Sequence, residues 1–131
     1  MMSVISRARA SYSVADFRKL RVWRKAHALA LNADRIAAEI RRADHKPLRV
    51  QMNRAAMSIP TNIVEGRGKR SDRDFARFLG YALGSATELE YHIIVARDVG
   101  AIADEDATSL LSHVVEIKKM LRGLIDRLSA Q

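Results

Sequence analysis

The sequence predicts an all-α protein, an antiparallel up-down-up-down four-helix bundle. Only two prolines and six glycines occur in 131 residues. Apolar residues recur every three or four positions through nearly the whole chain, whereas the strict alternation of strands is absent. Four such segments joined by short loops bury their apolar faces most simply as a bundle. We therefore expect one domain over residues 17–131, preceded by a disordered basic arm over residues 1–16.

The first helix is expected over residues 17–42. Its apolar side chains step by four and three and so share one face: Val22, Ala26, Leu29, Ala33, Ile36 and Ile40. Ser13 and Asp16 are placed to cap its start. Pro47 then opens the second helix, because a first helical turn tolerates a residue without an N–H.

The second helix continues to Gly66, with Leu48, Met52, Ala55, Ile59 and Ile63 on its apolar face. Pro60 lies inside this run, where it removes one backbone hydrogen bond and crowds the carbonyl of Ala56. The second helix is therefore predicted to be kinked near Pro60.

The third helix has the clearest boundaries. Ser71 and Asp74 form a capping box that starts it at Asp72, and Gly100 ends it. Its seam has the heptad spacing of a left-handed bundle: Phe75, Leu79, Ala82, Ala86, Leu89, Ile93 and Ala96. The fourth helix is predicted over about residues 105–129, with Asp104 as its cap.

Two features indicate contact with other subunits. The apolar residues of the fourth helix cover an arc of about 220°, whereas one core-facing stripe needs little more than about 100°. The third helix has a group of small residues that another backbone could approach: Gly80, Ala82, Gly84, Ser85 and Ala86. The alternative for both features is a broad core within a monomer.

The charge is strongly basic and unevenly distributed. The net charge is +8, and residues 1–77 hold 18 basic and 7 acidic side chains, against 5 and 8 in residues 78–131. Such a surface favours nucleic acid, an anionic membrane or an acidic protein as partner. The absence of cysteine excludes thiol catalysis and cysteine-ligated metal sites.

The segment between the second and third helices is the main candidate site for an anion. Together with the first turns of the third helix, it carries five basic residues, Arg67, Lys69, Arg70, Arg73 and Arg77. Cations at a helix start oppose the helix dipole, whereas free N–H groups and several arginines suit a phosphate. Because the GKS or GKT ending of a P-loop is missing, nucleic-acid backbone is favoured over ATP. The alternative is a solvated basic loop.

A second basic cluster at the start of the first helix supplies Arg18, Arg21 and Lys25 as secondary candidates. Trp23 lies among them, and we interpret it as a core or interface anchor rather than a surface on which bases stack.

Buried acids are expected to form a polar layer in the bundle. We expect Glu88 and Glu65 to pair with Arg54 or Asn62, because an unpaired buried carboxylate is costly. Glu88 and His92 are one residue further apart than the Glu-x-x-His pair of di-metal bundles, and the motif has no second copy. No metal, cofactor or catalytic residue is predicted.

The stretch from Gln51 to Phe75 resembles the signature of the 23S rRNA intervening-sequence proteins, also called S23 or four helix bundle proteins. The similarity continues from Ala82 to Leu89, and Phe17, Leu20, Val22, Trp23 and Ala26 match the family's opening. The resemblance implies a small bacterial four-helix bundle that assembles as a ring-like homo-oligomer, typically a pentamer, with a poorly established role. Similar bundles act beside a reverse transcriptase and its RNA, which supports nucleic-acid binding by analogy.

Together these features predict a non-catalytic, oligomeric bundle that binds nucleic acid, RNA being favoured, through a basic face. The alternative is an oligomeric scaffold or accessory protein that recruits a protein without contacting nucleic acid. The first residues lack the apolar core of a secretory signal, and no stretch of about 18 apolar residues could span a membrane, which predicts a cytoplasmic protein without a membrane partner.

Overall fold

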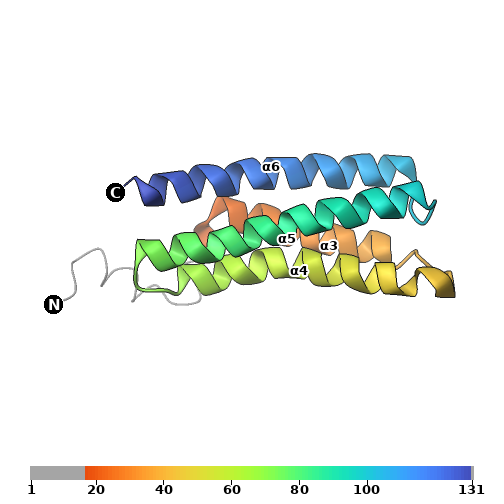
Figure 1. Ribbon diagram of the computed structural model, residues 1–131, viewed down its shortest axis with the longest axis horizontal. Coiled ribbons are helices and arrows are strands. Elements are labelled where there is room, and N and C mark those ends of the chain that lie inside the picture. Colours follow the sequence, from red (N-terminus) through yellow and green to blue (C-terminus); the bar gives the residue numbers. More distant parts are fainter. Residues whose placement is uncertain (1–16, 131) are drawn as a thin grey trace.

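The structure, a computed structural model, describes residues 17–130, in which the regular secondary structure is helical and short turns join the helices (Figure 1). A short 3₁₀ turn, η1 (Phe17–Lys19), precedes α3 (Arg21–Ala37), and a second, η2 (Ala43–His45), leads into α4 (Lys46–Arg67). Two longer helices follow, α5 (Asp72–Asp98) and α6 (Asp104–Ser129). The predicted basic arm, with Ser13 and Asp16, lies outside the described residues.

The four helices form the predicted antiparallel bundle. Figure 1 shows each helix running opposite to the one before it. Consecutive helices pack against each other, and α6 also packs against α3, which closes the bundle. The prediction of the fold class is confirmed.

The predicted apolar faces form the core. All six residues named for the first helix are buried, and so are all seven of the α5 seam. Met52, Ala55, Ile59 and Ile63 of α4 are also buried, while Leu48 is half-buried against the same core. The spacing of apolar residues therefore located the interior of the bundle correctly.

The first helix is shorter than the predicted 17–42. Leu20 is extended, with ψ of 122°, and separates η1 from α3. At the other end, Glu39 donates its N–H to the carbonyl of Ile36 and Ile40 to that of Ala37, the tight bonds of a helix terminus. Ile40 is buried although it lies beyond the helix.

Pro60 does not divide the second helix. α4 is continuous from Lys46 to Arg67, with Pro60 buried inside it and Pro47 in its first turn. Figure 1 shows α4 as one unbroken ribbon. Pro60 therefore causes no break in the helix, and the kink near it stays a prediction.

The boundaries of α5 agree with the prediction. Ser71 is extended and its hydroxyl accepts a hydrogen bond from the N–H of Asp74 at 3.1 Å. At the other end, Gly100 adopts a φ of +74°, and the N–H of Ala101 reaches the carbonyl of Ala96 at 2.8 Å. This is a Schellman ending, in which glycine is favoured because the left-handed conformation strains other residues.

The predicted cap of the fourth helix is wrong by one residue. Asp104 is already helical, and Ala103 occupies the cap position without a side-chain acceptor. Asp104 lies instead in the first turn of α6 with Glu105 and Asp106. The positive end of the helix dipole stabilises these three carboxylates.

The apolar arc of α6 and the small residues of α5, which suggested subunit contacts, have different environments in the structure. The apolar residues of the α6 arc are buried or half-buried within the single chain, except Val115, which is exposed. On α5, Ala82 and Ala86 are in the core, whereas Gly80 and Gly84 are exposed. The five small residues therefore do not share one face, since helical residues two positions apart point in nearly opposite directions.

We predict that Gly66→Ala destabilises the fold. A Cβ at Gly66 would lie 2.8 Å from the Cβ of Phe78 and 3.1 Å from the ring of Phe75, both on α5. Pushing α4 and α5 apart is expected to lower the free energy of unfolding by about 1–3 kcal/mol, as overpacking does. Urea denaturation measures the change.

The matched control is Gly68→Ala, two residues further on at the C-terminal cap of α4. Gly68 has an ordinary φ of −79°, and its added Cβ would meet its nearest neighbour at 3.6 Å. We expect its midpoint in urea to be unchanged or slightly higher. Equal destabilisation by both substitutions would contradict the close approach at Gly66.

Candidate nucleic-acid interface

Three segments that are distant in sequence meet at one end of the bundle. We call this the basic end and define it as residues 17–25, 65–77 and 118–129. Figure 1 places the start of α3, the α4–α5 loop and the end of α6 together there. Two surface grooves confirm these neighbours: Arg73 of α5 lines one with Leu128 of α6, and Arg21 of α3 lines the other with Arg127.

The antiparallel order concentrates positive charge at this end. Residues 17–25 hold five basic side chains and no acid, residues 65–77 five basic and three acidic, and residues 118–129 four basic and one acidic. The acids that flank the loop between α5 and α6, Asp98 at the end of α5 and Asp104 at the start of α6, lie at the opposite end. The charge is therefore polarised along the bundle axis.

Sequence reasoning missed the contribution of α6. Residues 78–131 as a whole are net acidic, and this average hid Lys119, Arg122 and Arg127, all of which are exposed. The signal was available, because an antiparallel fourth helix must end beside the start of the first and third.

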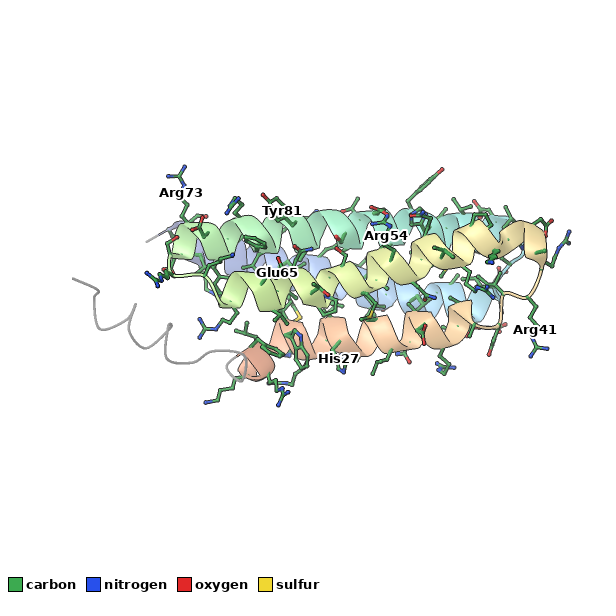
Figure 2. The ribbon with its side chains drawn as sticks, turned by 90° about the horizontal axis from the view of Figure 1, so that it is seen from below. His27, Arg41, Arg54, Glu65, Arg73 and Tyr81 are labelled. Carbon is green, nitrogen blue, oxygen red and sulfur yellow. The ribbon has the colours of Figure 1, made fainter. Side chains whose placement is uncertain are left out.

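Arg70, Arg73 and Arg77 are exposed on the first turns of α5 and in the loop before it, as the sequence predicted. Arg70 and Arg73 make no hydrogen bond or ion pair with another described residue, and Figure 2 shows Arg73 pointing away from the bundle. Arg77 is held from both sides along α5: it donates at 3.4 Å to Asp74 and at 3.4 Å to the hydroxyl of Tyr81. The two unengaged guanidinium groups are the most available cations of the predicted site.

The other two residues of the predicted site are half-buried over aromatic rings. The Arg67 guanidinium lies 5.8 Å from the centroid of the Phe75 ring, and the Lys69 ammonium lies 4.9 Å from that of Phe78. These cation–π contacts hold the loop against α5. Arg67 and Lys69 therefore support the site structurally and add to its potential, but their groups are less accessible than those of Arg70 and Arg73.

The secondary cluster is divided in the same way. Arg18 and Arg21 are exposed, whereas Lys25 forms an ion pair of 3.1 Å with Glu116 of α6. The hydrogen bond and charge of Lys25, with a smaller contribution from the charge of Arg21, lower the pKa of Glu116. Lys25 thus joins α3 to α6 and is the least available of the three.

Trp23 is an anchor, as predicted. Its ring lies 4.8 Å from Phe17 in an edge-to-face contact and stacks on His27 at 4.9 Å, and it packs against the core. Both contacts lie within the chain, so the ring is not a free stacking surface.

The predicted polar layer is only partly correct. Arg54 and Glu88 form the expected ion pair across α4 and α5, but their side chains are 53% and 39% exposed. The pair lies at the outer edge of the seam, where water solvates both charges, so it is not buried. Asn62 does not reach the pair; it donates to the carbonyl of Ser58 at 2.9 Å. Glu65 is exposed, and its predicted burial is wrong (Figure 2).

Serine hydroxyls make the neighbouring contact between the two helices. The Oγ atoms of Ser58 and Ser85 lie 2.7 Å apart, and Asn62 also reaches the Ser58 hydroxyl at 3.1 Å. Small hydroxyl side chains allow α4 and α5 to approach closely at this level of the seam.

His92 shares the carboxylate of Glu88. Its Nε2 lies 3.2 Å from the Glu88 Oε2 that Arg54 also binds. Partial burial, and secondarily the charge of Arg54, lower the pKa of His92 below its usual 6.5. Within residues 17–130 no group of three or more His, Asp and Glu side chains is arranged to hold a metal ion.

We predict that His92 makes the stability depend on pH. Because its pKa is lower in the folded than in the unfolded chain, the unfolded chain binds more protons below pH 6.5, and stability falls as the pH drops from about 7 toward 5. The melting temperature of His92→Gln should fall less over this range. Identical pH profiles for the two proteins would contradict the proposed burial effect.

The fold and the site define a class: a small antiparallel four-helix bundle with its positive charge concentrated at one end. None of the helices in the described range is long and apolar enough to cross a membrane. The family model for the 23S rRNA-intervening sequence protein matches residues 18–123. The chain belongs to this family, which confirms the resemblance seen in the sequence.

A solved structure supports this assignment. The chain is similar to a protein of unknown function from the S23 ribosomal protein family of Bacteroides thetaiotaomicron VPI-5482, with a TM-score of 0.75 and 27% identity. The match covers 79% of this chain and 97% of that one. The comparison with curated proteins gives no match.

Proposed function

We propose that this protein is a non-catalytic, cytoplasmic nucleic-acid-binding bundle, which holds phosphate backbone at its basic end without strong sequence readout. The observation that carries the proposal is the convergence of exposed cations from three segments, among them Arg70 and Arg73, which pair with no other described residue. The family's name associates it with the intervening sequence of 23S rRNA, which favours RNA over DNA. Phosphate contacts position a protein on a strand but carry no base specificity.

The salt dependence of RNA binding tests this proposal. If each subunit engages about four phosphates, log K should fall against log salt with a slope near −3 to −4. Arg70→Ala/Arg73→Ala should weaken binding at low salt and make that slope shallower by about 2, because two counterion-releasing contacts are lost. Fluorescence anisotropy of a labelled RNA, repeated with DNA of the same sequence, gives both quantities.

Arg41→Ala/Lys46→Ala is the matched control. Both residues are exposed and lie near η2 at the opposite end of the bundle, as Figure 2 shows for Arg41. The control removes the same charge but should shift the affinity little and leave the slope unchanged. Equal effects of the two pairs would mean that net charge alone attracts RNA, and would remove the assignment to the basic end.

We also propose that the protein acts as a homo-oligomer, a pentamer by family resemblance. Support comes from Gly80 and Gly84, which are exposed in mid-helix with no atom within 4 Å of a Cβ at either position. Mid-helix glycine costs up to about 1 kcal/mol, a cost that close approach of a neighbouring backbone would offset. Several basic ends in one assembly would bind one RNA with higher avidity than one end.

The oligomer is tested by Gly84→Arg. The fold of a single chain should tolerate the change, because the space at Gly84 is open. A close subunit contact would not, so light scattering should show a smaller mass than for the unchanged protein, at unchanged helicity. Thr108→Arg, which adds the same charge at an exposed position near the start of α6, is the control. Retention of the full mass by Gly84→Arg would contradict this interface.

The second candidate is a scaffold that recruits a protein. It is favoured by the exposed apolar side chains of α4, Val50 at 50% and Met57 at 53%. A protein partner that co-purifies without nucleic acid, at the 260/280 nm ratio of pure protein, would support it over the RNA proposal.

A further inference from the structure

Next to the unengaged arginines, four side chains form a connected cluster of rings and cations. The Phe78 ring lies 4.9 Å from the Lys69 ammonium and 5.2 Å from the Arg77 guanidinium. Tyr81 meets Phe78 edge to face at 5.2 Å, and its ring lies 6.0 Å from the same Arg77 guanidinium. The Arg77–Tyr81 contact at 3.4 Å completes the cluster.

These contacts fix Tyr81 without covering it. Phe78 is half-buried against α4 near Gly66, and it supports one edge of the Tyr81 ring. Tyr81 nevertheless remains 48% exposed. Figure 2 shows Tyr81 on the outer surface of the bundle. A planar group could therefore reach the ring.

The cluster is also aligned with the phosphate site. Arg73, Arg77 and Tyr81 follow each other at four-residue intervals, which places them on one face of α5 with a rise of about 6 Å per step. A strand whose phosphates lie on Arg73 and Arg77 would bring a base to Tyr81. Bases stack on aromatic rings and on guanidinium planes, and those in a duplex are already stacked on each other.

We infer that Tyr81, positioned by Phe78 and Arg77, is a stacking platform for an unpaired base, and that the protein prefers single-stranded to double-stranded nucleic acid. This inference rests on the proposed function, since the basic end must hold the backbone. Arg70 and Arg73 provide affinity for either form, and Tyr81 discriminates between them. A neighbouring subunit on Gly80 and Gly84 would occupy the adjacent strip of α5, on the side away from Phe78.

The test compares three labelled RNA probes with equal numbers of phosphates: a single strand, a hairpin duplex and a single strand in which abasic sites replace the bases. The unchanged protein should bind the single strand most tightly. Tyr81→Ala should weaken that binding by about 5- to 150-fold, the range measured for one stacked base, and should leave the other two probes unaffected. Tyr81→Phe, which keeps the ring, should retain the preference.

Tyr91→Ala is the matched control. Tyr91 is on the same helix and 63% exposed, but its ring contact is with His92 and not with an arginine. It should change none of the three affinities. An unaltered preference in Tyr81→Ala, an equal loss on all three probes, or a changed oligomer mass in light scattering would overturn the inference.

The outcomes separate this inference from the function beneath it. If the unchanged protein binds none of the probes at low salt, the nucleic-acid proposal fails together with the platform. If it binds all three and Tyr81→Ala behaves like the unchanged protein, only the platform fails.

Discussion

The close approach of α4 and α5 at Gly66 is the constraint on which the candidate site depends. Because Gly66 has no side chain, Phe75 and Phe78 pack directly against the last turn of α4. The short turn between the two helices then brings Arg67 over Phe75 and Lys69 over Phe78. With the loop held in this way, Arg70 and Arg73 point outward, and Phe78 supports both Arg77 and Tyr81. One glycine thus determines the geometry of the cations and of the exposed ring.

Much of the fold followed from the sequence because the interior of a bundle requires a simple pattern. Steps of three and four identified all seven buried residues of the α5 seam, and the pairing of Ser71 with Asp74 identified its start. The ends of the first helix and the cap of α6 were missed, since they depend on local hydrogen bonds that many sequences can make. At Pro60 the core accommodates a residue that isolated helices disfavour.

The candidate site was harder to predict, because its features come from neighbours in space. The positions of Arg70 and Arg73 were expected, but the approach of the α6 cations required the topology. The need to neutralise a carboxylate near the core predicted the pair of Arg54 and Glu88 correctly. It could not predict that both side chains are partly exposed. Sequence reasoning considered Trp23 as the aromatic of interest and passed over Tyr81, since exposure is what distinguishes the two rings and periodicity leaves Tyr81 unassigned.

The bundle topology also reduces the electrostatic cost of the basic end. Cations at the start of α5 oppose its dipole, and Asp72 and Asp74 in its first turn offset part of this cost. At the same end, however, α4 and α6 finish, and the negative ends of their dipoles favour Arg67 and Arg127 in their last turns. Because two helices begin and two end there, the dipoles largely cancel, and the field at the surface is set by the side chains. The arginines therefore attract an approaching phosphate with little opposition from the helix dipoles. The repulsion between these arginines and the dipole of α5, which the sequence of α5 alone implied, destabilises the folded chain little for the same reason.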